Sequence, residues 1–272
     1  MTSKPFARAL TRRTDITLWW RVAAIVMVVA NTVFNAVSER SGDQSMRAIT
    51  ERYDNAFVPA GWAFSIWGII YAAFIVYAVV GLLPKNRTRR LFDRTAMPLA
   101  LVNLLASAWL IAFRAEIMGL AQGIIMAMVV LGAIAYREVF RARRDAEVSG
   151  WALVPWALFL AWVCVATIAQ TTISLVALGW DGAPLDGVTW ASIMMVVALA
   201  LGLVLSLRHS DFVIAVVFGW ALLALWDANR GSAETQSSAM VALVAAIVAF
   251  AVGFILASQH ALRLMSGPRG KP

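Results

Sequence analysis

The sequence predicts an all-α fold, a polytopic membrane helix bundle of about eight transmembrane helices. Hydrophobic residues make up 61% of the 272 residues and charged residues only 14%, whereas a soluble domain carries roughly 25% charged residues. The apolar residues form runs of roughly 17–25 residues, the length that crosses a hydrocarbon layer. We read eight such runs, at residues 17–37, 60–83, 96–113, 117–136, 152–178, 188–207, 210–228 and 237–258.

Lysine and arginine gather in alternate loops, which supports this count of spans. With the N-terminus inside, the inner segments carry 17 of the 23 basic residues and the outer segments carry 5, while Arg21 lies within the first run. Because basic residues favour the cytoplasmic side, we expect both termini in the cytoplasm. We expect a bacterial inner membrane as the location. The net charge of +8 then faces anionic head groups, so membrane lipid is the expected partner and nucleic acid is not.

The connections divide the chain into three expected parts. Residues 1–16 form a basic lead-in, residues 17–180 a five-helix bundle, and residues 181–272 a three-helix extension with a short basic tail. Among the outer connections only residues 38–59 form a long one, with charges of both signs. Long loops in compact folds are often lids or binding loops. This connection is therefore either a lid over a binding site or a solvated connector.

Few side chains capable of chemistry lie inside the runs. Lysine occurs only at positions 4, 85 and 271, which excludes a retinal-binding photoreceptor. Two histidines at run ends and one cysteine cannot ligate a haem iron in the bilayer or build a conventional zinc site. No carboxylate lies at mid-membrane, where coupled carriers usually place one, and Arg21 and Arg114 lie close enough to a run end to extend toward water. We expect no enzyme activity, no catalytic residue, no metal and no cofactor.

The stretch from Pro59 to Tyr71 concentrates aromatic residues at the start of the second run. At about 100° per residue, Phe64, Trp67 and Tyr71 fall on one helical face. Lipid already favours any apolar side chain, so three rings on one face indicate a more specific surface. That surface suits either a flat apolar ligand or tight packing on another helix.

The polar residues inside the runs are neutral, and all but one of them occur in pairs three or four positions apart. These residues are Asn31 and Asn35, Asn103 and Ser107, Gln122, and Thr167 and Gln170. In hydrocarbon they need hydrogen-bond partners. They either bond between helices or face a cavity and bind the polar edges of a ligand. Gly119 and Gly123 form a GxxxG motif, which serves either internal packing or a homodimer.

Four patterns follow one another in a fixed order along the chain. Residues 59–64 read Pro-Ala-Gly-Trp-Ala-Phe, residues 103–107 read Asn-Leu-Leu-Ala-Ser, residues 119–137 form a charge-free run ending in a basic loop, and residues 162–170 read Trp-Val-Cys-Val-Ala-Thr-Ile-Ala-Gln. Together they resemble helices two to five of the tryptophan-rich sensory protein and translocator family (TspO/MBR, the peripheral benzodiazepine receptor relatives). The resemblance covers about residues 17–178.

This resemblance implies a five-helix translocator-like core with an outer-loop-capped pocket that binds porphyrins, sterols and synthetic aromatic ligands. The loop at 38–59 would be the lid. To the matching positions we add Trp109 and Gln170, which stand near or at family positions with a different residue. The candidate ligand-binding residues are Trp62, Phe64, Trp67, Tyr71, Asn103, Trp109, Trp162, Ala166, Thr167 and Gln170.

The chain also departs from the family pattern. Ala60 replaces a proline, and five residues rather than six separate Trp62 from Trp67. One residue fewer turns everything after it by about 100°, so these two rings cannot both hold their usual directions unless the helix start readjusts. The last three runs have no counterpart in the five-helix form, although residues 177–182 are similar to a turn in a longer branch of the family.

Our leading hypothesis is a membrane receptor or binding protein for a flat hydrophobic ligand, either a tetrapyrrole such as a porphyrin or an isoprenoid, with a sensory or regulatory role. Aromatic walls supply apolar area and stacking, and a few neutral polar groups orient the ligand. The alternatives are a small-solute transporter, which the three extra runs would complete, and an accessory subunit of a larger membrane complex.

Overall fold

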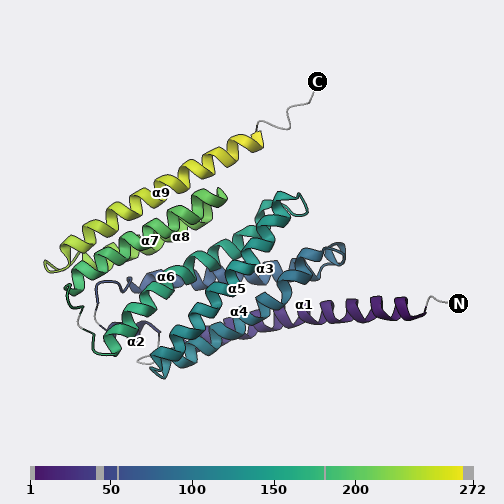
Figure 1. Cartoon of the computed structure of the whole chain (residues 1–272), viewed down its shortest axis with the longest axis horizontal. Helices are drawn as coiled ribbons and strands as arrows, with labels where there is room; N and C mark the ends of the chain where they lie inside the picture. Colours follow the sequence, from purple (N-terminus) through teal and green to yellow (C-terminus); the bar gives the residue numbers. More distant parts are fainter. Residues whose placement is uncertain (1–3, 41–45, 54, 181, 266–272) are drawn as a thin grey trace. The chain divides into compact units, whose positions relative to one another are not determined.

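The computed structural model describes residues 4–40, 46–53, 55–180 and 182–265. Over these residues the chain is helical with no strand, and eight helices are long and apolar enough to cross a membrane (Figure 1). The predicted all-α bundle with eight spans is confirmed. The α-helices are α1 (Lys4–Ser38), α2 (Met46–Arg52), α3 (Ile66–Leu82), α4 (Arg90–Arg114), α5 (Met118–Arg144), α6 (Val154–Ala177), α7 (Gly187–His209), α8 (Phe212–Asn229) and α9 (Gln236–Met265). Short 3₁₀ helices are η2 (Gly61–Ser65), η3 (Pro84–Asn86) and η4 (Gly150–Leu153).

Several helices run further into the basic segments than their apolar runs predicted: α1 begins at Lys4 and α9 ends at Met265, and α4 and α5 are also longer. Helix α4 begins at Arg90 and α5 ends at Arg144, several residues beyond the expected limits. A helix satisfies its own backbone hydrogen bonds, so it does not have to stop where the hydrocarbon stops. In the added turns Glu138 pairs with Arg94 at 3.6 Å and with Arg141 at 3.4 Å.

The chain forms two compact units, each built from two stretches of sequence. The first takes in the described residues up to Ala48 and those from Ser65 to Phe159, and the second takes in Ile49–Phe64 and the described residues from Leu160 onward. Helix α6 contributes its first residues to one unit and its remainder to the other. The expected domain boundary at residue 180 stays a prediction.

In the first unit α4 packs between α1 and α5, and α3 packs on α1 (Figure 1). Arg21 of α1 holds this unit together at the α3–α4 connection. Its guanidinium bonds to Asp93 through Nε at 2.8 Å and Nη2 at 2.7 Å. It also donates to four backbone carbonyls, those of Gly81, Asn86, Arg87 and Arg89.

Arg21 is only 5% exposed, so the expectation that it extends to water is wrong. The five N–H groups of an arginine need acceptors when they are buried. A carboxylate and four carbonyls at the end of α3, in η3 and at the start of α4 supply them. The residue therefore fixes the connection instead of leaving the bundle.

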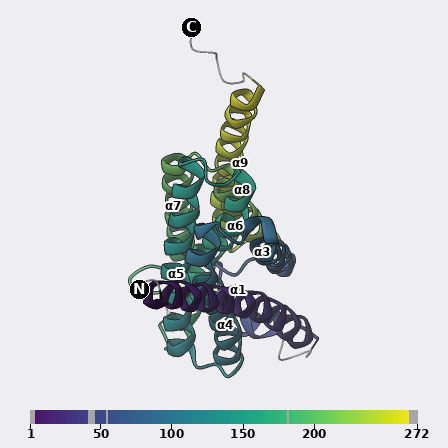
Figure 2. The same cartoon turned by 90° about the vertical axis from the view of Figure 1, so that its right-hand side faces the viewer.

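In the second unit α8 packs on α9 and α7, and α7 also packs on α9; α8 and α9 lie side by side in both views (Figures 1 and 2). Glycines allow the close approach. A Cβ on Gly202 of α7 would lie 2.6 Å from the ring of Phe218, and one on Gly219 of α8 would lie 2.9 Å from the ring of Phe250. Side chains at either position would push the helices apart.

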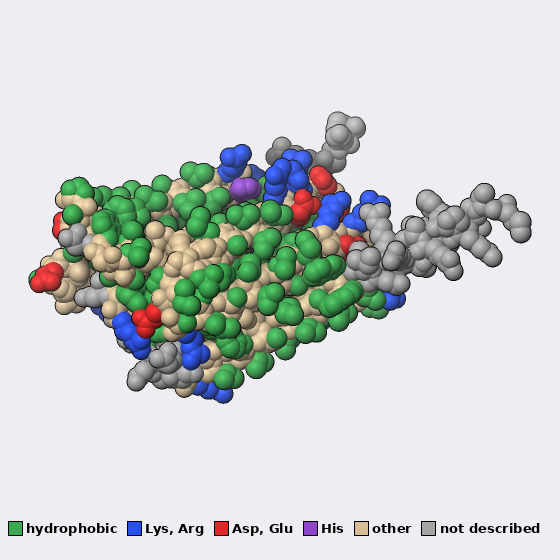
Figure 3. Space-filling model, turned by 60° about the horizontal axis from the view of Figure 1, so that its bottom comes forward, with side chains coloured by type: hydrophobic (Ala, Val, Ile, Leu, Met, Phe, Trp, Pro, Cys, Tyr) green, Lys and Arg blue, Asp and Glu red, His purple; other side chains and the backbone are tan. Residues whose placement is uncertain are grey.

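Large hydrophobic side chains remain exposed along the spanning helices, among them Val26, Ile111, Val130, Val204 and Val244. Hydrophobic side chains cover much of the face in Figure 3, and Lys and Arg gather toward its ends. This distribution is that of a protein whose solvent is lipid. The chain is an integral, multi-pass membrane protein.

Candidate functional site

The second span begins as a 3₁₀ helix. Residues 61–65 form η2, and α3 starts at Ile66. A 3₁₀ helix turns about 120° per residue against about 100° in an α-helix. Phe64 lies in η2, while Trp67 and Tyr71 lie on α3; that the three rings share one face stays a prediction. This turn lies at the helix start, between the two tryptophans whose spacing is one residue shorter than in the family pattern.

Trp67 and Tyr71 do share a face of α3. Their rings stack with centroids 5.5 Å apart and an interplanar angle of 22°. Both are buried, with 7% and 6% exposed. This face of α3 is part of the core of the first unit.

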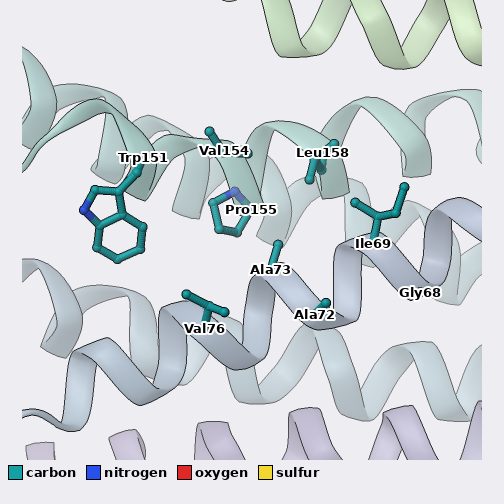
Figure 4. Close-up of a pocket in the computed structure, with 9 residues that line it drawn as sticks. All are labelled: Gly68, Ile69, Ala72, Ala73, Val76, Trp151, Val154, Pro155 and Leu158. Carbon is teal, nitrogen blue, oxygen red and sulfur yellow. The ribbon is translucent and has the colours of Figure 1, made fainter.

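Other faces of α3 contribute to an open groove in the first unit. The groove has a volume of about 620 Å³, and it runs between α3 and the start of α6 (Figure 4). Its lining residues are Gly68, Ile69, Ala72, Ala73, Val76, Trp151, Val154, Pro155 and Leu158. No side chain among them other than the indole of Trp151 carries a polar atom.

The α3 side of the groove is recessed because small residues occupy successive turns of the helix there. Gly68, Ala72 and Val76 are four positions apart, so they lie one above another along the helix. A Cβ on Gly68 would meet nothing within 4 Å. Trp151 closes one end, 40% exposed, with its indole nitrogen turned away from the rest of the lining (Figure 4). The volume lies within the roughly 300–1,000 Å³ of small-molecule sites.

Neutral amides join α1 to α4 in the first unit. Asn31 donates to Asn103 Oδ1 at 3.1 Å and accepts from Ser107 Oγ at 2.8 Å and Asn35 Nδ2 at 2.8 Å. Asn103 Nδ2 donates to the carbonyl of Leu99 at 2.9 Å. Of the two roles open to these residues, hydrogen bonding between helices is the one that the structure shows.

Trp109 also belongs to the buried part of α4. It is 7% exposed and stacks on Phe113 of the same helix, with centroids 5.2 Å apart and an interplanar angle of 16°. The two rings are four positions apart, which is the spacing at which helical side chains meet.

In the second unit, Trp62 is held by two residues of α8. Its Nε1 donates to Asp227 Oδ2 at 2.9 Å. Its ring meets Trp220 edge-on, with centroids 4.6 Å apart and an interplanar angle of 88°. Asp227 also accepts from Arg230 Nε at 2.8 Å, and the guanidinium of Arg230 lies over the ring of Trp226.

The same helix binds the backbone around Trp62, which we call the 55–64 segment. Ala60 N donates to the carbonyl of Ala224 at 3.0 Å. Asn229 Nδ2 donates to the carbonyl of Ala56 at 2.9 Å, and Trp220 Nε1 donates to that of Ala63 at 3.2 Å. The end of the long connection at 38–59 is thus docked on α8 through its main chain.

The remaining candidates lie on α6 in the second unit. Trp162 is buried and meets Phe64 edge-on at 6.3 Å between centroids. Thr167 Oγ1 donates to the carbonyl of Val163 at 2.7 Å, and Gln170 Nε2 donates to Ser174 Oγ at 3.2 Å. Ala166 is half-buried beside them in the sequence.

The profile of the family described as TSPO-like protein matches residues 17–256. The chain belongs to the TSPO-like family. The match extends beyond the 17–178 that the short motifs cover and takes in α7, α8 and most of α9, so these helices are part of the family pattern. No curated protein and no solved structure matches the chain.

The candidate residues of this TSPO-like protein fall into both units. Trp67, Tyr71, Asn103 and Trp109 belong to the first, and Trp62, Phe64, Trp162, Ala166, Thr167 and Gln170 belong to the second. Their role in ligand binding stays a prediction. None of the ten lines the groove along α3.

Sequence reasoning missed three features of the TSPO-like chain. The groove was missed because small residues at helical spacing, such as Gly68 and Ala72, carry no chemical signal of their own. Arg21 was missed because its acceptors are backbone carbonyls. The third missed feature is the hydrogen bond between Trp62 and Asp227. Its one available signal was the position of Asp227, a carboxylate in the last turn of an apolar run.

Proposed function

We propose that this TSPO-like protein is a membrane receptor that binds a hydrophobic small molecule within the bilayer. One observation carries the proposal: the groove of about 620 Å³ along α3, lined by apolar side chains and closed at one end by Trp151. A concave apolar surface with one aromatic wall is a common form of ligand site. A sensory or regulatory role would follow from occupancy of this groove.

The lining favours an isoprenoid over a tetrapyrrole. A porphyrin carries propionate groups and ring nitrogens, and such groups are costly to bury without hydrogen-bond partners. The groove offers none of these partners along its floor, where Gly68, Ala72 and Ala73 lie. A hydrocarbon chain gains contact with the lining and leaves no polar group unsatisfied.

The test is equilibrium binding of geranylgeraniol and of protoporphyrin to purified protein in detergent. We expect saturable binding of geranylgeraniol with one site per chain. Ala72→Phe places a ring in the groove and should weaken binding at least about tenfold, because added volume in an occupied site is not tolerated. Ala30→Phe is the matched control, since Ala30 is an exposed alanine on α1 outside the groove.

Two results would overturn the proposal. The first is no saturable binding of either compound by wild-type protein. The second is equal binding by wild type, Ala72→Phe and Ala30→Phe, which would place any bound compound elsewhere. Tighter binding of protoporphyrin than of geranylgeraniol would reverse the choice of ligand class while keeping the binding role.

A further inference from the structure

We infer that the ligand is an isoprenoid phosphate, with its chain in the groove along α3 and its phosphate at the basic end beside Trp151. The inference rests on the proposed function and deepens it. It depends on three features of the first unit: the charges at one end of the groove, the indole N–H of Trp151, which donates to no described residue, and the shape of the groove floor.

Two basic side chains neighbour the Trp151 end of the groove, one along the chain after α3 and one in space beside Gly150. Lys85 comes three residues after the end of α3 and is exposed. On the other wall, Arg143 approaches the residue before Trp151: a Cβ on Gly150 would lie 3.7 Å from Arg143 Nε. A phosphate at this end of the groove would meet a cation on either side.

Three acidic side chains of this unit are engaged with other cations, while the exposed Glu147 has no ion pair among the described residues. Glu138 pairs with Arg94 and Arg141, Asp145 pairs with Arg144, and Asp93 pairs with Arg21. Within the described residues, neither Lys85 nor Arg143 has a carboxylate within ion-pair distance. Both cations are therefore available to an anion from outside the chain, and charge-assisted bonds to phosphate are among the strongest of their kind.

Trp151 supplies a neutral donor at the same place. It is 40% exposed, and its Nε1 donates no hydrogen bond to any described residue. The nitrogen lies on the side of the ring that faces away from the groove lining (Figure 4). A tryptophan in this position has its apolar edge on the chain and its N–H toward a head group, which is the usual arrangement at a membrane interface.

The groove floor favours a branched chain over a straight one. Gly68 has open space where its side chain would be, and Ala72 is the next small residue on the same face. Methyl branches can fill such notches, whereas a straight acyl chain leaves them empty and loses the dispersion contacts. We therefore commit to an isoprenoid phosphate instead of a phospholipid of the surrounding bilayer.

The experiment compares three ligands on the full-length protein in detergent: geranylgeranyl phosphate, geranylgeraniol and dioleoyl phosphatidylglycerol. We expect the phosphate to bind more tightly than the alcohol, with a Kd about tenfold lower. The advantage should shrink as salt rises from low to high concentration, because the contacts are near the surface. Phosphatidylglycerol should compete only weakly.

Arg143→Gln and Lys85→Gln should each reduce the advantage of the phosphate to less than about threefold while leaving the affinity for geranylgeraniol unchanged. Binding of the alcohol thus reports that each variant is folded. Arg114→Gln is the control, because Arg114 is a cation of the same unit at the opposite end of α4. It should leave both affinities at their wild-type values.

Each remaining outcome overturns the inference in a distinguishable way. Equal affinity for the phosphate and the alcohol would reject the phosphate site and leave the proposed function standing. Full competition by phosphatidylglycerol would show a site for bulk phospholipid. Failure of both isoprenoids to bind would reject the proposed function, and the inference with it.

Discussion

The indole of Trp62 and the carboxylate of Asp227 are joined by a hydrogen bond of 2.9 Å across 165 positions of sequence. Trp62 belongs to the motif that opens the second span, and Asp227 lies in the last turn of the seventh. With the bonds from Ala60 to Ala224 and from Asn229 to Ala56, this contact gives α8 a role: it fixes the 55–64 segment.

Asp227→Ala should loosen the 55–64 segment. The substitution removes the acceptor of Trp62 and the partner of Arg230 together. We expect amide hydrogen exchange in residues 55–64 to accelerate about tenfold, as local opening becomes easier. Asp227→Asn keeps an oxygen for Trp62 and should change exchange much less. Wild-type exchange rates in Asp227→Ala would mean that the backbone bonds alone hold the segment.

Arg21→Met should destabilise the first unit strongly. Removing one partner of a buried pair costs about 3–5 kcal/mol, and here four carbonyls lose their donor as well. The measurement is the free energy of unfolding in detergent. Arg94→Met is the matched control, because Arg94 is 50% exposed and meets Glu138 at 3.6 Å; an exposed pair contributes about 0–1 kcal/mol. Equal losses of unfolding free energy in Arg21→Met and Arg94→Met would contradict the role of Arg21 in fixing the α3–α4 connection.

Asn31→Leu should lower the free energy of unfolding more than a substitution of any neighbouring residue in the amide cluster. Asn31 is 1% exposed and bonds to Asn103, Ser107 and Asn35, so its removal leaves several polar groups without partners. A cost of about 1–3 kcal/mol is expected for such groups. Ser107→Ala removes a single bond and should cost about 0.6 kcal/mol, the average for one interhelical bond in a membrane. Unfolding in denaturing detergent measures both.

Asp186 should give the start of α7 a dependence on pH. Its side chain accepts from the Thr189 hydroxyl at 2.6 Å and from Thr189 N at 2.9 Å. These bonds, that of the hydroxyl first, lower the pKa of Asp186 below its ordinary value. A lowered folded-state pKa means that the stabilisation is complete above the unfolded pKa of about 3.9 and is lost as pH falls through the folded value.

The chemical shift of the Thr189 amide reports this titration. We expect its midpoint below the ordinary aspartate value in the wild type. In Asp186→Asn the amide should show no titration over that range, while the helix keeps its cap, because asparagine also caps helices well. A midpoint at or above the ordinary aspartate value would contradict the bonds described here.

Gly123→Leu tests the proposal that the protein forms a homodimer. Gly119 and Gly123 are exposed on α5, and Cβ atoms on them would meet nothing within 4 Å. The motif is thus not used for packing against the described residues, and its face is open to another helix. We expect Gly123→Leu to shift sedimentation toward the monomer and Ala30→Leu to leave it unchanged. A wild-type monomer at all concentrations would reject the dimer.

The number of spans was predictable because hydrocarbon selects for apolar length, and that property is local in the sequence. The ends of α4 and α5 were not, since charged residues such as Arg90 and Arg144 continue a helix without adding to its apolarity. Arg21 was misjudged for a different reason. Its partner Asp93 lies 72 positions away, and its other acceptors are carbonyls, which no residue type reveals.

The candidate site was predictable only in its local contacts. The stack of Trp67 on Tyr71 follows from α-helical spacing within one element. The 3₁₀ turn that holds Phe64 was not predicted, because the aromatic spacing there suits an α-helix as well. The groove forms because α3 and α6 leave a space beside Gly68 and Ala72. It could not be predicted, because it depends on how the two helices pack and not on any single residue.

The docking of the 55–64 segment on α8 also sets an order for synthesis. A ribosome adding about 5–20 residues per second needs about 8–33 s to make the 165 positions from Trp62 to Asp227. Until then the segment has no acceptor for its indole and no carbonyl at Ala224 for its backbone. Maturation of the second span therefore has to wait for the arrival of the seventh, and a nascent chain released before α8 would carry its aromatic motif unanchored.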